Sequence, residues 1–143
     1  MFFVAGYGML LPRRQQDGAI QVMETKPTIL ILAIPGNLQT SLQMLLSLLN
    51  DVAVLVTGEC SSVMQIIEKH IPSLVIMEFD LPGENMPIVA KLIKERWPKI
   101  PCLVLVDDEQ QRQQAKGTGA DLVLVKGYPA SKLITAIEEL LSS

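Results

Sequence analysis

Two carboxylates, Glu78 and Asp80, stand where an apolar run meets a turn. The run SLVIMEF covers residues 73–79 and is followed by Asp80 and then by Leu81-Pro82-Gly83. Carboxylates at the carboxyl end of a buried strand often serve binding or catalysis, because ligands of open α/β sheets bind at that edge. What these two can do depends on the side chains that the neighbouring strands bring to the same edge.

Five short apolar runs alternate with amphipathic segments from Thr28 onward. Between the runs, apolar residues recur at helical spacing, as in Leu38, Leu42 and Leu45. Unbroken apolar strands are typical of a parallel sheet that is buried on both faces, and each intervening segment is long enough for a crossover helix. The pattern predicts an α/β fold, a doubly wound five-stranded parallel sheet in a three-layer α/β/α sandwich. The predicted strands are residues 28–34, 52–58, 73–79, 101–106 and 121–125.

The composition is that of a compact globular chain. Its 143 residues carry a net charge of −3, with 49% hydrophobic and 19% charged residues. Basic residues do not cluster beyond Arg13-Arg14, so we expect no nucleic-acid partner. The two cysteines, Cys60 and Cys102, share no metal-ligand spacing with His70, which predicts no zinc site and reduced thiols, as in a cytoplasmic protein.

Residues 1–26 show no sustained periodicity and are predicted to form a loosely ordered extension ahead of a domain that spans residues 27–143. The apolar opening MFFVAGYGMLL is too short to span a bilayer, and it lacks the flanks of a secretory signal. We therefore expect no membrane anchor. A translation start at Met23 is an open alternative.

The stretch from Pro72 to Gly83, together with GADLVLVKG at residues 119–127, resembles the receiver domain of bacterial two-component response regulators, the CheY-like superfamily. The resemblance implies a flavodoxin-like strand order, 2-1-3-4-5. In that family an aspartate four residues before the proline of a similar turn accepts phosphate from a histidine kinase. Here that position is Glu78.

The other family positions are also changed. Ala33 and Ile34 occupy the places of the acid pair that holds Mg²⁺, Val106 replaces a hydroxyl residue, and Val123 replaces an aromatic switch residue, while the family lysine is kept as Lys126. Phosphoryl transfer depends on neutralising charge, and Mg²⁺ needs oxygen ligands to do so. The resemblance therefore implies a degenerate pseudo-receiver without bound Mg²⁺, without a cofactor and without enzymatic activity.

The retained lysine is expected to face Glu78 as an ion pair at the carboxyl edge of the sheet. One interpretation is that Glu78 permanently mimics the phosphorylated state. The other, which we favour, is a relic pair that satisfies the strand ends, because Val106 and Val123 remove the usual means of reporting an active state. Asp80 is interpreted as a turn former near Leu81 and Pro82.

Acidic residues also follow the fourth apolar run. We interpret Asp107, Asp108 and Glu109 as the beginning of a helix, where exposed N–H groups favour acids. A substitute metal site near Glu78 is the alternative that this acidic segment leaves open.

Our main hypothesis is a receiver-like domain of two-component, or phosphorelay, signal transduction that has lost phosphorylation and acts by protein–protein interaction. The expected partner is a histidine kinase or an output protein, and a homodimer is left open. One alternative is a working phosphoacceptor that uses Glu78 or Asp80, and another is a flavodoxin-like domain that binds a small ligand. The resemblance suggests a partner surface that includes Gln110, Gln113, Lys116, Tyr128 and Lys132.

Overall fold

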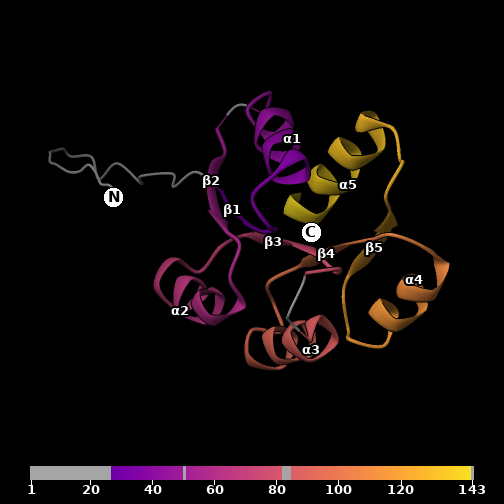
Figure 1. The fold of residues 1–143 in the computed structure, drawn as a ribbon. Helices are drawn as coiled ribbons and strands as arrows, with labels where there is room; N and C mark the ends of the chain where they lie inside the picture. Colours follow the sequence, from indigo (N-terminus) through magenta and orange to yellow (C-terminus); the bar gives the residue numbers. More distant parts are fainter. Residues whose placement is uncertain (1–26, 50, 82–84, 143) are drawn as a thin grey trace, which may run out of the picture.

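The computed structural model describes residues 27–49, 51–81 and 85–142. Within these ranges five strands alternate with five helices along the chain (Figure 1). The predicted extension at residues 1–26 and the turn at Pro82-Gly83 lie outside the described residues. The elements are β1 (Thr28–Leu32), α1 (Asn37–Leu46), β2 (Ala53–Thr57), α2 (Cys60–His70), β3 (Leu74–Glu78), α3 (Met86–Arg96), β4 (Cys102–Val106), α4 (Glu109–Lys116), β5 (Leu122–Val125) and α5 (Ala130–Ser142).

The strands form one parallel sheet in the order β2-β1-β3-β4-β5, which confirms the expected flavodoxin-like arrangement. Each strand lies inside its predicted apolar run and is shorter by one or two residues. The run that begins at Thr28, for example, extends to Ile34, but β1 ends at Leu32 and Ile34 is exposed in the following loop. Apolar character therefore extends past the hydrogen-bonded part of the strand.

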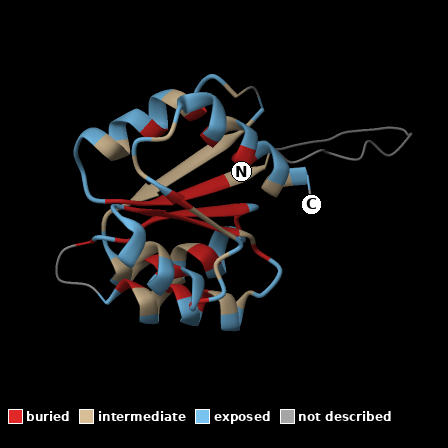
Figure 2. Ribbon diagram, turned by 90° about the vertical axis from the view of Figure 1, so that its right-hand side faces the viewer, coloured by how far each residue is buried: buried red, intermediate tan, exposed pale blue. Residues whose placement is uncertain are grey.

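Helices cover both faces of the sheet, with α1 and α5 on one face and α2, α3 and α4 on the other (Figure 1). The three central strands are buried, as Figure 2 shows, apart from the half-buried Thr28 at the start of β1. The two edge strands are different: every residue of β2 is half-buried, and of β5 only Leu124 is buried. Both faces of the edge strands pack against the core layers, but their burial is only partial, because an edge strand has a neighbour on one side only.

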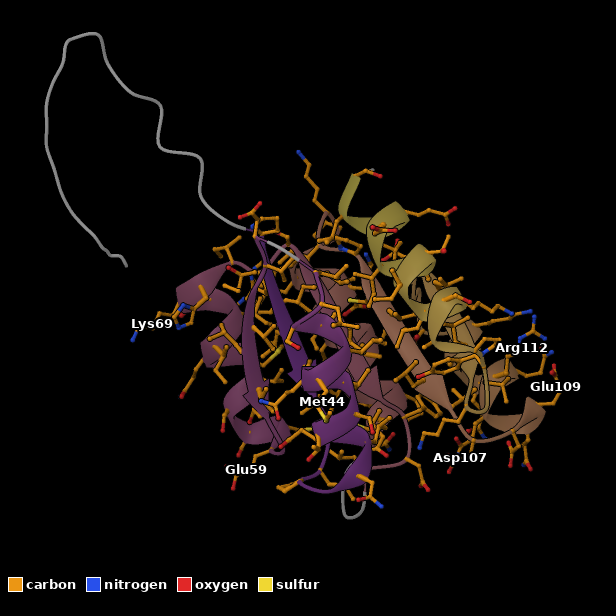
Figure 3. All side chains as sticks on the ribbon, turned by 90° about the horizontal axis from the view of Figure 1, so that it is seen from above. Met44, Glu59, Lys69, Asp107, Glu109 and Arg112 are labelled. Carbon is orange, nitrogen blue, oxygen red and sulfur yellow. The ribbon has the colours of Figure 1, made fainter. Side chains whose placement is uncertain are left out.

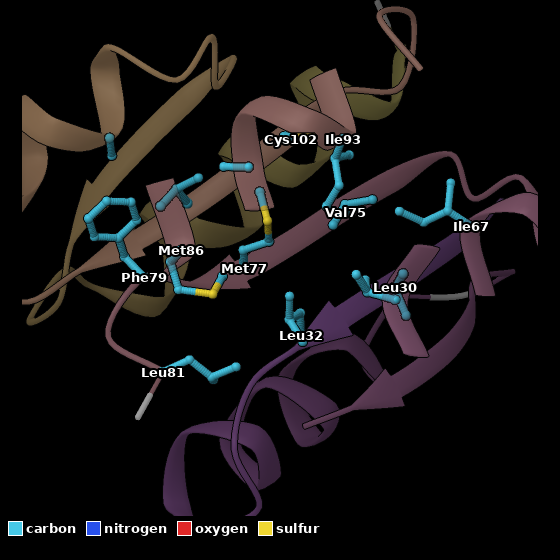
Figure 4. Close-up of a cluster of buried hydrophobic side chains, with 14 of the residues drawn as sticks. Leu30, Leu32, Ile67, Val75, Met77, Phe79, Leu81, Met86, Ile93 and Cys102 are labelled. Carbon is cyan, nitrogen blue, oxygen red and sulfur yellow. The ribbon is translucent and has the colours of Figure 1, made fainter. Parts of the chain in front are cut away.

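Alternation along the central strands divides the core into two layers. On the face covered by α2 and α3, Val75 and Met77 of β3 belong to the same cluster as Leu30 of β1, Ile67 of α2 and Ile93 of α3 (Figure 4). The alternate residues of the same strands pack with α1 and α5 in the second layer. Both layers hold the strands in register, so the positions where the strands end are fixed.

Side-chain caps begin the two helices nearest to the carboxyl edge of β3 and β4. The Asn85 carboxamide oxygen accepts a hydrogen bond from the Ile88 N–H at the start of α3. The Asp108 carboxylate accepts one from the Gln111 N–H at 2.9 Å at the start of α4. Such caps satisfy N–H groups that have no partner inside the helix. The acidic start predicted for the fourth helix is present.

No helix in the described ranges is long and apolar enough to cross a lipid bilayer.

Candidate functional site at the carboxyl edge of the sheet

The parallel register brings the carboxyl ends of β3, β4 and β5, which we call their exits, to the same level. Glu78 is paired with Leu105, and Val106 is paired with Val125. Asp107 and Lys126 follow this last pair directly in the two adjacent strands. The Lys126 N–H donates to the Val106 carbonyl at 2.8 Å, which extends the ladder by one residue. A carboxylate on β3, a carboxylate after β4 and an ammonium after β5 are therefore neighbours.

Glu78 is only 7% exposed, and both of its carboxylate oxygens have partners. Oε2 lies 3.1 Å from Lys126 Nζ, so the ion pair expected from the sequence is present. Oε1 accepts a hydrogen bond from the Ile34 backbone N–H at 3.3 Å. A buried carboxylate is costly unless it is paired and hydrogen-bonded, and these two contacts meet that requirement.

Asp107 belongs to this site through a contact with Lys126 that the sequence interpretation did not predict, although one alternative placed the acidic segment near Glu78. Its Oδ1 lies 2.7 Å from Lys126 Nζ, closer than the Glu78 carboxylate. Figure 3 shows Asp107 beside the beginning of α4, where the sequence predicted a role in helix initiation. Asp108 is the residue that caps α4. Asp107 directly follows β4, and Lys126 directly follows the neighbouring β5. These two positions are the sequence signal that could have predicted the contact.

Asp80 also turns toward this cluster. The pKa of Asp80 is raised, first by a side-chain hydrogen bond with Asp107 and then by burial and by the negative charges of Asp107 and Glu78. This contact has a physical reason: the loop after β4 approaches the end of β3, and two carboxyl groups that meet share a proton more readily than they both ionise. The role of Asp80 as a turn former stays a prediction, because Pro82 and Gly83 lie outside the described residues.

Lys126 holds the carboxylates together. Its hydrogen bond to Asp107 is the largest cause that lowers the pKa of that carboxyl. Burial lowers the pKa of Lys126 itself, but hydrogen bonds and charge from Asp107 and Glu78 outweigh burial and raise it. The ammonium is therefore firmly charged at neutral pH. One ammonium is shared by two carboxylates, so the three groups carry a net charge of about −1 and leave this part of the edge without a strong positive field for a phosphoryl group.

The coupled acids predict a pH dependence of stability. Asp107, with its lowered pKa, stabilises the fold above its unfolded pKa and loses this effect as the pH falls through its folded value. Asp80, with its raised pKa, has the opposite sign and loses its contribution as the pH rises. Asp80→Asn should therefore stabilise the protein more at about pH 7 than at about pH 3, on either side of a normal aspartate pKa.

The measurement is urea unfolding at both pH values, with Asp108→Asn as the matched control. That variant removes a neighbouring carboxylate, and asparagine keeps the capping function at α4. Equal pH dependence in the two variants would contradict the contact between Asp80 and Asp107.

Three further positions that carry side-chain oxygens in the family, here Ala33, Ile34 and Val106, have none in this chain. Ala33 is fully buried, its carbonyl accepts a hydrogen bond from Gln39 Nε2 at 2.8 Å, and Ile34 is 38% exposed. Val106 is fully buried in the core layer beneath α2, α3 and α4, with other apolar side chains. The described residues contain no group of three or more His, Cys, Asp or Glu side chains that could hold a metal ion.

The cysteines stand apart from the site. Cys102 is buried in β4, and burial raises the pKa of its thiol to about 12. A thiol with such a pKa is protonated at neutral pH and therefore a poor nucleophile.

The suggested partner surface lies across α4 and the beginning of α5. Gln110, Gln113, Lys116 and Lys132 are exposed, and Gln113 Nε2 donates to Glu109 at 2.8 Å. Tyr128 is half-buried, and burial raises the pKa of its hydroxyl. The structure thus makes four of these five side chains available for contacts, and their use by a partner stays a prediction.

A family model of the response regulator receiver domain matches residues 36–138. The chain belongs to this family. It is a receiver domain of two-component signalling. Among curated relatives, the transcriptional regulatory protein DegU of Brevibacillus brevis is 27% identical over 121 residues, which cover 82% of this chain and 51% of the relative. The oxygen regulatory protein NreC of Staphylococcus haemolyticus is 29% identical over 103 residues, which cover 69% of this chain and 48% of that relative.

Solved structures agree on the fold of this receiver domain. The signal receiver domain of an HD domain-containing protein from Pseudomonas fluorescens Pf-5 superposes with a TM-score of 0.76 at 21% identity, covering 87% of this chain and 93% of that chain. A response regulator receiver domain protein from Clostridium thermocellum superposes with a TM-score of 0.72 at 19% identity, covering 81% of this chain and 94% of that chain. The chain spans about half the length of the curated relatives it matches.

Proposed function

We propose that this receiver domain takes no part in phosphoryl transfer and works as a non-catalytic docking module in cytoplasmic signalling, where it binds a histidine kinase or an output protein. The observation that carries the proposal is the contact of Glu78 with Lys126 at 3.1 Å, in a site where Ala33 and Ile34 replace acids. The lysine that would meet a phosphoryl oxygen is already bound to two carboxylates.

The charge balance supports the proposal. A phosphoryl group adds negative charge at the acceptor, and phosphoryl transfer depends on cations placed to receive that charge. Here the nearest cation is neutralised by Glu78 and Asp107, and the donor set offers little to a hard divalent ion, which requires several oxygen ligands. A phosphoryl group at Glu78 would therefore meet repulsion rather than neutralisation.

The fixed contacts of Glu78 also support a structural role for this residue. Its carboxylate ties the exit of β3 to the loop after β1 through the Ile34 N–H, and to the end of β5 through Lys126. These links join three loops at the carboxyl edge without an external ligand. A partner would meet one constant surface rather than a surface that changes with phosphorylation.

Intact-mass spectrometry after incubation with acetyl phosphate and Mg²⁺ tests the loss of phosphorylation. We expect no mass gain of a phosphoryl group on the wild-type protein. A mass gain would overturn the proposal, and its loss in Glu78→Gln or in Asp80→Asn would identify the acceptor. The Asp80→Asn arm therefore also tests the alternative in which Asp80 accepts phosphate.

A magnesium titration followed by NMR provides a matched comparison. The double variant Ile34→Asp/Glu78→Asp restores one ligand at an exposed position together with the family acceptor. We expect saturable shifts of the amide signals at residues 34 and 78 in this variant and none in the wild type. Equal saturable responses in the two proteins would contradict the proposed loss of the metal site.

A further inference from the structure

Helix α1 carries apolar side chains that the core does not use. The segment NLQTSLQMLLSLL, residues 37–49, contains no Asp, Glu, Lys or Arg. Met44 and Leu48 are 67% and 74% exposed, and they are four residues apart along the helical segment and its final turn. Figure 3 shows Met44 on the outward side of α1, and Figure 1 shows α1 beside α5. Neighbouring exposed apolar side chains on a segment without charges, here Met44 and Leu48, are a candidate interaction surface.

This stripe leads into a groove between the ends of α1 and α5, which we call the α1–α5 groove. Its apolar lining includes Leu48, Leu49, Val52 and Leu141, and its volume is about 510 Å³. Val52 directly precedes β2, and Leu141 lies in the last turn of α5. The groove is therefore at the amino edge of the sheet, opposite to the edge that carries Glu78.

The charged side chains that line the groove among the described residues are both acidic. They are Asp51, between α1 and β2, and Glu138 on α5. Asp51 and Glu138 are both exposed, and we call them the acidic rim of the groove. Apolar side chains together with these carboxylates complement a helix that carries leucine-like residues on one face and Lys or Arg beside them. A second copy of this chain is a poorer match, because a twofold contact would bring the two acidic rims together.

We propose that the α1–α5 groove binds a basic amphipathic helix of a partner protein. The apolar anchors of that helix cover Leu48 and Leu141, and its basic residues approach Asp51 and Glu138. This inference does not depend on the loss of phosphorylation, because it concerns the other edge of the sheet. Peptide binding and phosphoryl mass gain are separate measurements, so the two proposals can fail independently.

A synthetic leucine–lysine peptide of about 14 residues, long enough for about four helical turns, is a suitable probe for the full-length protein. NMR titration should show saturable shifts of the amide signals around residues 48, 52 and 141. A leucine–glutamate peptide of the same pattern should bind at least about tenfold more weakly, since its charges oppose the acidic rim.

Two variants separate specific binding from general attraction to an acidic protein. Leu48→Ser and Glu138→Gln should each weaken binding of the leucine–lysine peptide, Leu48→Ser by about tenfold, which is the effect of losing one buried apolar contact. Ile88→Ser on α3, another exposed apolar position at 55%, is the matched control and should leave the affinity unchanged. Equal affinity in Leu48→Ser and Ile88→Ser would overturn the proposal.

Two other occupants of the groove would also overturn it. Concentration-dependent dimerisation of the free protein that Leu48→Ser abolishes would assign the groove to a second copy. Peptide binding to a chain that starts at Pro27, combined with no binding to the full-length chain, would assign it to the residues before Pro27. Sedimentation of the free protein and a repeat of the titration with the shortened chain measure these outcomes.

Discussion

Lys126→Met is expected to destabilise the protein by about 1–3 kcal/mol, because it leaves the Glu78 carboxylate buried without its cation. The cost stays at this level rather than higher, since the Lys126 side chain is 29% exposed and water screens part of the interaction. Asp107 also loses the hydrogen bond that lowers its pKa. Urea unfolding at about pH 7 measures the change in the free energy of unfolding.

The same experiment has an internal test and a control. The double variant Glu78→Gln/Lys126→Met removes both charges, and glutamine still accepts the hydrogen bond from the Ile34 N–H, so about half or more of the lost stability should return. Lys116→Met removes an exposed lysine of α4 and should change stability by less than about 0.5 kcal/mol. If Lys126→Met behaves like Lys116→Met, the buried ion pair does not contribute as proposed.

The fold could be predicted from the sequence because each strand reads as an apolar run and each helix as a periodic one. The runs fixed where strands occur, but periodicity carries no information on which strands are neighbours. That order came from the family resemblance and is confirmed by the β2-β1-β3-β4-β5 sheet. Burial of the edge strands was overestimated, because an apolar run alone does not reveal whether a strand has one neighbour or two.

The residues of the site were predictable where their distance from a recognisable sequence motif identified them. The family resemblance identified Glu78, by counting back from Pro82, and Lys126 as the retained lysine, and the structure places their charged groups 3.1 Å apart. The contact of Asp107 with Lys126 was not predicted, because it requires the register of β4 against β5, in which Val106 faces Val125. The Ile34 N–H could not be found, since every residue except proline has such a donor and only the chain path shows which one meets a carboxylate.

The rigidity of the carboxyl edge depends on the buried strands beneath it, and the largest expected effect lies there. Ile76 is fully buried in β3, two residues before Glu78, and it is paired with Ile31 and Leu103. Ile76→Ala removes buried methyl groups and leaves a cavity, so it should lower the free energy of unfolding by about 2–5 kcal/mol.

Ile88→Ala is the matched control for this substitution, because the same groups are removed from a side chain that is 55% exposed. Urea unfolding of this variant should differ from the wild type by less than about 0.5 kcal/mol. Similar losses in the two variants would show that the packing of β3 is not what supports the site. A larger loss for Ile76→Ala than for Lys126→Met would mean that apolar packing, rather than the ion pair, contributes most to holding the three strand exits together. The charges at this edge could then differ from the family pattern, as they do at positions 33 and 34, while the docking surface kept its shape.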